Sequence, residues 1–99
     1  MANKRWRVLS IYHTGKMGKR GEERIDGLYP DRKERIFIID PNKINIGKPL
    51  FMECAANFMK STITSPVMSF SVKGERLKFR TSNSVYILEE LEDVGDVND

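Results

Sequence analysis

The chain has 99 residues, enough for one domain with a modest hydrophobic core. Charged residues make up 31% of it and hydrophobic residues 39%, a balance typical of globular proteins in solution. No apolar run approaches the roughly 20 residues of a membrane helix, and no signal-length apolar stretch follows the N-terminus. We therefore expect a cytoplasmic protein that does not bind membranes. The single Cys54 allows no internal disulfide, which suits a reducing compartment.

The net charge of +3 conceals an uneven distribution along the chain. Residues 89–99 carry six of the 14 acidic side chains and no basic one, whereas the other 88 residues hold 17 basic and eight acidic side chains, a balance of +9. A basic body favours an anionic partner, and the acidic end could compete for the same surface. The simpler interpretation is a flexible tail at residues 92–99 behind a single domain of residues 1–91.

Residues 6–13 are rich in β-branched and aromatic side chains and predict a first strand. Strict alternation would place Leu9 and Ile11 on one face of this strand and Trp6, Val8 and Tyr12 on the other. Both faces are then expected to be covered.

Residues 14–35 follow as a long polar connection that is rich in Gly, Lys and Arg. Loops longer than about 12–15 residues in a compact domain are often functional. Gly15, Gly18 and Gly21 would let backbone N–H groups approach phosphate oxygens, while the neighbouring Lys and Arg supply charge. Their spacing matches neither phosphate-binding glycine motif, and no clear helix follows, so a nucleotide-hydrolysing P-loop is not expected. We interpret the segment as a mobile, basic anion-binding loop, with a merely solvated loop as the alternative.

Two further strands are predicted over residues 35–39 and 50–54, and residues 55–60 form either a helical turn or an irregular link. Residues 61–91 then show the strongest pattern, that of a three-stranded antiparallel meander. Every second residue from Met68 to Val72 is apolar, which predicts that this face is buried.

The first strand of the meander should begin its pairing at Val67 or Met68, because Pro66 cannot donate to a ladder. In its second strand Leu77 and Phe79 share one face, and Lys78 and Arg80 point outward.

Five or six short antiparallel strands in fewer than 100 residues must hide their edges, and closure into a small barrel does so. We predict a mainly β protein with a small, SH3-like, partly closed barrel, since a long loop after the first strand is typical of that architecture. An OB-like barrel and an open α+β sheet are the alternatives.

Residues 64–67, with the sequence TSPV, and residues 79–89, with the sequence FRTSNSVYILE, carry a resemblance. They are similar to the ends of small uncharacterised proteins of Firmicutes phages and prophages, which follow a TSxV…TxNSxYxLE pattern. The resemblance covers about the last third of the chain and implies a mobile-element origin. It carries over no functional residue.

Basic side chains and aromatic rings together are the ingredients of a nucleic-acid-binding surface. We expect an anion-binding site for nucleic acid or a nucleotide from eight basic residues: Lys16, Lys19, Arg20, Arg24, Arg32, Lys33, Lys78 and Arg80. The candidates for stacking on bases are Trp6, Tyr12 and Tyr29, although such rings more often belong to the core of so small a domain. The alternative is a protein-interaction module, such as an inhibitor of a host or anti-phage defence protein.

Catalysis finds little support in the sequence. His13 is the only histidine, and Cys54 lies in an apolar strand where an inert buried thiol is usual. One His and one Cys far apart do not make a zinc site. We therefore predict a binding protein without catalytic residues, metal or cofactor, and leave its oligomeric state open.

Overall fold

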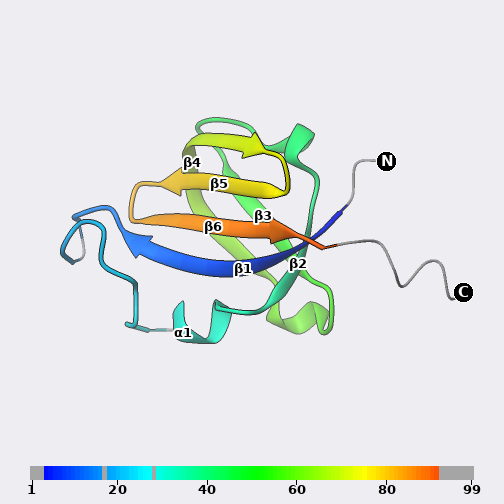
Figure 1. The fold of residues 1–99 in the computed structure, drawn as a ribbon, viewed down its shortest axis with the longest axis horizontal. Helices are drawn as coiled ribbons and strands as arrows, with labels where there is room; N and C mark the ends of the chain where they lie inside the picture. The colour runs from blue at the N-terminus through cyan, green and yellow to red at the C-terminus, as the bar shows by residue number, and fades with distance from the viewer. Residues whose placement is uncertain (1–3, 17, 28, 92–99) are drawn as a thin grey trace, which may run out of the picture.

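A computed structural model describes residues 4–16, 18–27 and 29–91 of the chain. Six antiparallel strands form a closed barrel (Figure 1). They are β1 (Lys4–His13), β2 (Ile36–Ile39), β3 (Pro49–Cys54), β4 (Thr62–Lys73), β5 (Arg76–Thr81) and β6 (Ser84–Glu90). The short helices are α1 (Tyr29–Arg32), η1 (Pro41–Lys43) and η2 (Phe58–Lys60). The tail predicted at residues 92–99 lies outside the described residues.

The strands follow one another around the barrel in chain order, and β6 returns to pair with β1. The prediction of a mainly β protein with a small barrel of five or six strands is confirmed. The barrel is closed rather than partly closed, because β1 and β6 pair along most of their lengths, from Trp6 opposite Glu90 to His13 opposite Ser84.

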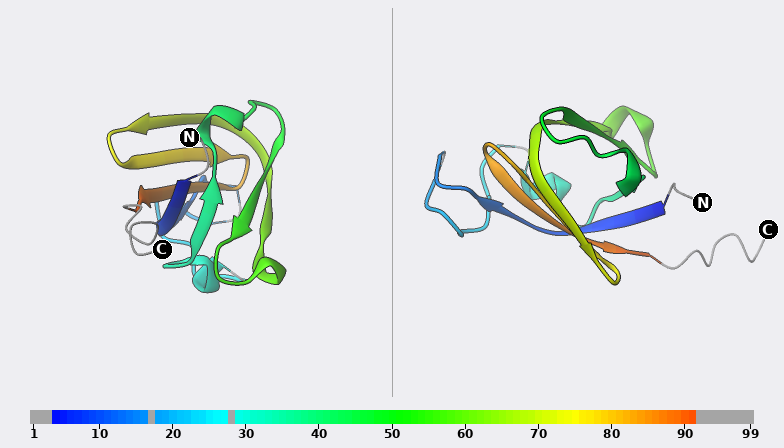
Figure 2. Two further views of the ribbon diagram at one scale, coloured as in Figure 1. Left: turned by 90° about the vertical axis from the view of Figure 1, so that its right-hand side faces the viewer. Right: turned by 90° about the horizontal axis from the view of Figure 1, so that it is seen from above.

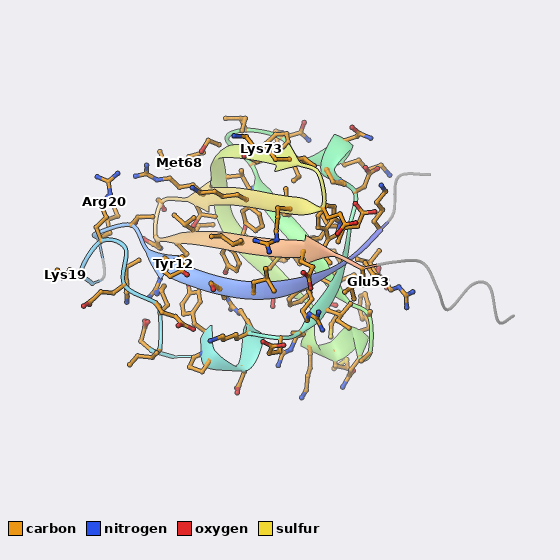
Figure 3. All side chains as sticks on the ribbon, viewed as in Figure 1. Tyr12, Lys19, Arg20, Glu53, Met68 and Lys73 are labelled. Carbon is orange, nitrogen blue, oxygen red and sulfur yellow. The ribbon has the colours of Figure 1, made fainter. Side chains whose placement is uncertain are left out.

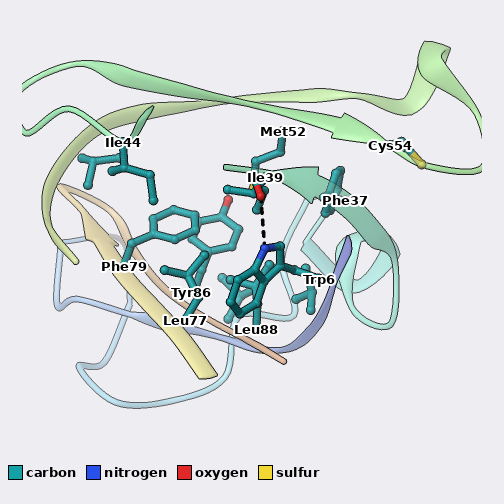
Figure 4. Close-up of a cluster of buried hydrophobic side chains, with 13 residues drawn as sticks. Trp6, Phe37, Ile39, Ile44, Met52, Cys54, Leu77, Phe79, Tyr86 and Leu88 are labelled. Atoms are coloured by element: carbon teal, nitrogen blue, oxygen red, sulfur yellow. Dashed lines mark hydrogen bonds between the residues drawn. The ribbon is translucent and has the colours of Figure 1, made fainter. Parts of the chain in front are cut away.

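The core is a single cluster of buried side chains from all six strands (Figure 4). Trp6 is 1% exposed, and its indole N–H donates a hydrogen bond to the carbonyl oxygen of Ile39 at 3.2 Å. The rings of Phe79 and Tyr86 stack with centroids 4.7 Å apart. Because the indole satisfies its only donor inside the barrel, Trp6 can fill the core without leaving a buried polar group unpaired.

A β-bulge between Val8 and Ser10 changes which side chains of β1 face inward. Trp6 and Val8 point into the core, and beyond the bulge Ile11 does so as well. The prediction that Leu9 and Ile11 share one face is wrong, because the extra residue of a bulge shifts the alternation by one position. The prediction that Tyr12 shares the face of Trp6 and Val8 is wrong for the same reason, and Tyr12 is directed outward.

Strand β4 begins at Thr62, earlier than predicted, because it has two partners in succession. Its first half pairs with β3 as far as Pro66, which lies opposite Pro49. Its second half pairs with β5 from Val67 onward. The missing N–H of Pro66 therefore falls where the strand changes partner, not where the strand starts.

The far half of β4 and its turn into β5 project from the barrel (Figure 2), while β5 itself stays in the wall, paired with β6. Gly74 takes a left-handed conformation in the hairpin turn, with φ of 59°. The prediction of a buried face on this part of β4 is wrong, since Met68, Phe70 and Val72 are 55%, 37% and 44% exposed. Among the described residues, no strand pairs with the outer edge of this stretch, so its side chains are covered only in part.

Candidate nucleic-acid interface

The outer face of β4, β5, β6 and β1 brings together side chains from distant parts of the chain. The strand registers place its outward residues in three rows across four strands, and their inward neighbours form the core. The rows are Tyr12–Val85–Arg80–Ser69, Ser10–Ile87–Lys78–Ser71 and Arg7–Glu89–Arg76–Lys73. We call this surface the outer face. Lys78 and Arg80 point outward on it, as predicted from the alternation in β5.

Two depressions of about 340 and 450 Å³ lie on the outer face and share four lining residues, Arg20, Lys78, Arg80 and Val85. The first depression extends to Tyr12 and the start of the long loop, and the second to Ser69 and Ser71 on β4. Together they form one shallow groove that crosses the sheet from β1 to β4. We call it the outer groove.

Arg20 reaches this groove because backbone hydrogen bonds fix the far part of the loop against β1. Gly21 donates to the carbonyl of His13 at 3.0 Å, and His13 donates to the carbonyl of Glu22 at 2.8 Å. The amide of Arg24 donates to the carbonyl of Ile11 at 2.7 Å. The loop was interpreted as mobile, yet residues 21–24 extend the sheet beside β1. Figure 3 shows Lys19 and Arg20 at the outer end of the loop and Tyr12 on the sheet.

Gly18 packs directly against the His13 ring, where an added Cβ would lie 2.6 Å from the nearest ring atom. The imidazole side chain is only 10% exposed, and its Nε2 lies 3.7 Å from Oδ1 of Asp26. Its Nδ1 is buried and has no hydrogen-bond partner among the described residues. His13 is thus a packing residue at the base of the loop, and only one edge of it borders the outer groove.

Arg24 was predicted to bind an anion, but the structure buries it at 5% exposure. Its guanidinium donates to both carboxylate oxygens of Asp26 and to the hydroxyl of Ser84, the latter at 2.9 Å. The hydrogen bond that Arg24 donates to Asp26 raises the pKa of Arg24, and the same bond lowers the pKa of Asp26. The donors of Arg24 tie the loop to the turn before β6. They are not available to a ligand.

Tyr29 lies between two guanidinium groups, with the Arg24 Cζ 3.9 Å and the Arg32 Cζ 4.8 Å from its ring centroid. Arg32 also donates to the hydroxyl of Tyr86 at 2.9 Å. Burial raises the pKa of Tyr86. The structure therefore uses Tyr29 and Arg32 to hold the loop and α1 against the barrel, and neither lines the outer groove.

Of the other predicted residues, some lie at or near the outer groove and others lie away from it. Lys33 pairs with Glu23 at 2.8 Å, which raises the pKa of Lys33, and lies away from the outer groove. Lys16 and Lys19 are exposed on the loop that carries Arg20. Trp6 is buried and offers no face for stacking, whereas the half-buried Tyr12 lines the groove.

Three basic residues of the outer face were missed by the sequence reasoning: Arg7, Lys73 and Arg76. Arg76 continues the outward alternation of Lys78 and Arg80, so the same pattern could have found it. Arg7 is different because the carboxylate of Glu89 lies 2.6 Å from it, and this hydrogen bond raises the pKa of Arg7. Lys73 and Arg76 are exposed at the hairpin end of the face.

The described residues contain no group of three or more His, Cys, Asp or Glu side chains arranged to hold a metal ion. Cys54 is free and buried at 4% exposure. In the part of the chain that the structure describes, no helix is both long and apolar enough to cross a membrane.

Comparison with known proteins gives no relative: no family model, curated protein or solved structure matches the chain. The similarity to phage proteins therefore stays a prediction, and the function must be argued from the outer face itself.

Proposed function

We propose that this protein binds single-stranded nucleic acid along the outer groove and does so without catalysis. The observation that carries the proposal is the convergence of Arg20, from the long loop, with Lys78 and Arg80, from β5, around one groove that Tyr12 also lines. Cationic side chains contact a phosphate backbone, and an aromatic ring stacks on bases of any sequence.

The shape of the site favours a strand over a mononucleotide. A small-ligand pocket typically encloses most of its ligand, whereas the outer groove is a shallow trough open to solvent over four strands. With neighbouring strands about 4.8 Å apart, three gaps give the trough a length of roughly 14 Å. Lys73 and Arg76 extend the positive charge toward the hairpin end.

The groove lining also supports binding without chemistry. It contains no carboxylate and no cysteine among the described residues, and the one histidine at its border is packed against Gly18. The hydroxyl groups in the lining therefore have no carboxylate beside them there to act as a base.

Fluorescence anisotropy tests this proposal with a labelled single-stranded DNA, its RNA counterpart, a duplex and a mononucleotide, each over a salt series. We expect the single strands to bind more tightly than the duplex and the mononucleotide, with an affinity that falls as salt rises. Absent binding, or affinity that does not depend on salt, would contradict the proposal.

A second candidate function, binding to a host protein, is favoured by an exposed apolar cluster on another side of the barrel. Phe51, Phe58, Met59 and Ile63 are 48%, 63%, 88% and 68% exposed. The Phe51 ring lies 6.0 Å from that of Phe58 and opposite Ile63 in the strand register. Adjacent exposed apolar side chains of this size commonly mark protein interfaces.

A groove of about 500 Å³ beside this cluster is lined by Arg32, Arg35 and Lys60 and by one carboxylate, Asp31, so its excess of positive charge suits an acidic partner with apolar side chains. A pull-down from bacterial lysate should lose any specific partner when Phe51 and Ile63 are replaced by serine. The Lys78→Ala/Arg80→Ala variant should retain that partner. If both variants recover the same proteins as the wild type, the cluster is not the interface.

A further inference from the structure

The outer edge of β4 is open along its projecting half. Beyond Pro66, β4 pairs with β5 alone, from Val67 to Lys73. The segment before β3 reaches β4 only at Val67, which accepts from Gly47 at 2.7 Å and donates to Lys48 at 2.9 Å. Among the described residues, no backbone hydrogen bond reaches the outer edge of residues 68–73. Figure 2 shows the far half of β4 outermost, projecting from the barrel.

This edge lacks the devices that usually prevent strands from pairing with other chains. Natural edges carry a charge, a proline or a bulge within the exposed run. Residues 68–72 read MSFSV, without charge or proline, so that only the bulge between Val67 and Ser69 at one end and Lys73 at the other bound the open run. Phe70 and Val72 lie opposite the buried Phe79 and Leu77, yet both remain well exposed.

We propose that a second copy of this chain occupies the edge, with the two β4 strands antiparallel about a two-fold axis at Ser71. Ser71 is the centre of the regular run from Ser69 to Lys73. The axis places Phe70 of each copy opposite Val72 of the other, and Ser69 opposite Lys73. Apolar side chains meet on one face of the sheet and no two like charges oppose each other.

A second copy fits better than an unrelated strand because the run is complementary to itself. Phe70 and Val72 stand at equal distances on either side of Ser71, so a two-fold axis there brings exposed apolar groups together from both copies. Lys78 and Arg80 lie one strand away on β5, so pairing does not press them together. Such a contact is isologous and closes at two copies.

The geometry also has a consequence for the outer face. A two-fold axis at an antiparallel strand pair is perpendicular to the sheet, so both outer faces point the same way. The two outer grooves would then lie on one continuous sheet. Pairing of two short strands buries less than the area of a stable interface, so the dimer should be reversible and depend on concentration.

Sedimentation equilibrium without nucleic acid tests the dimer separately from the proposed function. The wild type should move from 11.4 kDa toward twice that mass as its concentration rises from micromolar to millimolar. Ser71→Lys places two positive charges at the axis and should hold the mass at 11.4 kDa. Ser10→Lys makes the same change on the same face, on β1, three strands from β4, and should associate as the wild type does.

A wild type that stays at 11.4 kDa at every concentration would overturn the proposal, as would a Ser71→Lys variant that associates normally. Disulfide formation gives a second readout: oxidised Ser71→Cys should yield a covalent dimer on a denaturing gel, and Ser10→Cys should not. Equal yields from the two variants would contradict the register. Sedimentation is measured without nucleic acid, so a monomeric wild type would leave the proposed function untouched, and absent nucleic-acid binding would leave the dimer untouched.

Discussion

Replacing Lys78 and Arg80 together by alanine should weaken binding to single-stranded nucleic acid and flatten its salt dependence. Both side chains are exposed, point outward from β5 and line the two depressions of the outer groove. Their loss removes two cations without disturbing the inward Leu77 and Phe79, which are fully buried. The fold should therefore survive, as a circular dichroism melt would show.

The size of the effect follows from the number of cations on the outer face that have no carboxylate partner among the described residues: Arg20, Lys73, Arg76, Lys78 and Arg80. When a protein neutralises Z phosphates of a single strand, the logarithm of its binding constant falls with the logarithm of the salt concentration with a slope of about −0.7Z. Five such contacts predict a slope of about −3.5. Removing two contacts should change the slope to about −2.1. At 0.1 M salt this corresponds to roughly a 25-fold loss of affinity, and the loss should vanish toward 1 M salt.

The matched control is Lys43→Ala/Lys48→Ala, which lowers the net charge equally. Both lysines are exposed between β2 and β3, and neither lines the outer groove. Anisotropy titrations at four or five salt concentrations should give this control the wild-type slope. Equal slopes for the control and the Lys78/Arg80 variant would refute the reasoning, because binding would then follow net charge alone.

Three other changes test the neighbourhood of the groove. Tyr12→Leu should cost about 1–3 kcal/mol of binding free energy for a single strand, whereas Tyr12→Phe should bind nearly normally, because stacking needs a ring. If anisotropy titrations show the same loss of affinity for both variants, Tyr12 does not stack on a base. Gly18→Ala should lower the free energy of unfolding by about 1–3 kcal/mol, since its Cβ would meet the His13 ring, and His13→Ala in the same chain should recover part of the loss in chemical denaturation. Because Arg24 holds the pKa of Asp26 below its ordinary value of 3.8, the loop contact should persist above that pH and weaken only as the pH falls through the lower, folded-state pKa. Hydrogen exchange of the Arg24 amide should follow this transition in the wild type, and an unchanged transition in Asp26→Asn would contradict the assignment.

The strands themselves could be predicted because their evidence is local. The alternation of Leu77, Lys78, Phe79 and Arg80 alone predicts which side chains of β5 are buried and which point outward, and the structure confirms it. The hairpin turn at Gly74 is equally local, since it depends on one residue that accepts a positive φ.

What escaped prediction depends on an added residue or on a distant partner. The bulge after Val8 adds one residue to β1, and every assignment beyond it changes face. Phe70 has the pattern of a core residue, but its burial depends on how far β4 extends past the barrel.

The candidate site was predicted only in part, because some of its residues depend on contacts with residues far away in the sequence. Charge and glycine content drew attention to the long loop, and Arg20 does meet Lys78 and Arg80 at one groove. Arg24 lies in the same kind of basic, glycine-rich sequence as Arg20, yet its guanidinium donates its hydrogen bonds to Asp26 and Ser84. A guanidinium's role depends on its neighbours in the fold, and Ser84 is 60 residues away.

The most direct test of the account is a titration of the isotope-labelled protein with a short single-stranded oligonucleotide, followed by amide and side-chain NMR shifts. We predict that the largest shifts fall on the outer face and its loop, at Tyr12, Arg20, Lys78, Arg80 and Val85, while residues 43–48 and 58–63 stay unchanged. Shifts concentrated at residues 58–63, or none at saturating oligonucleotide, would contradict the claim that the outer groove binds nucleic acid.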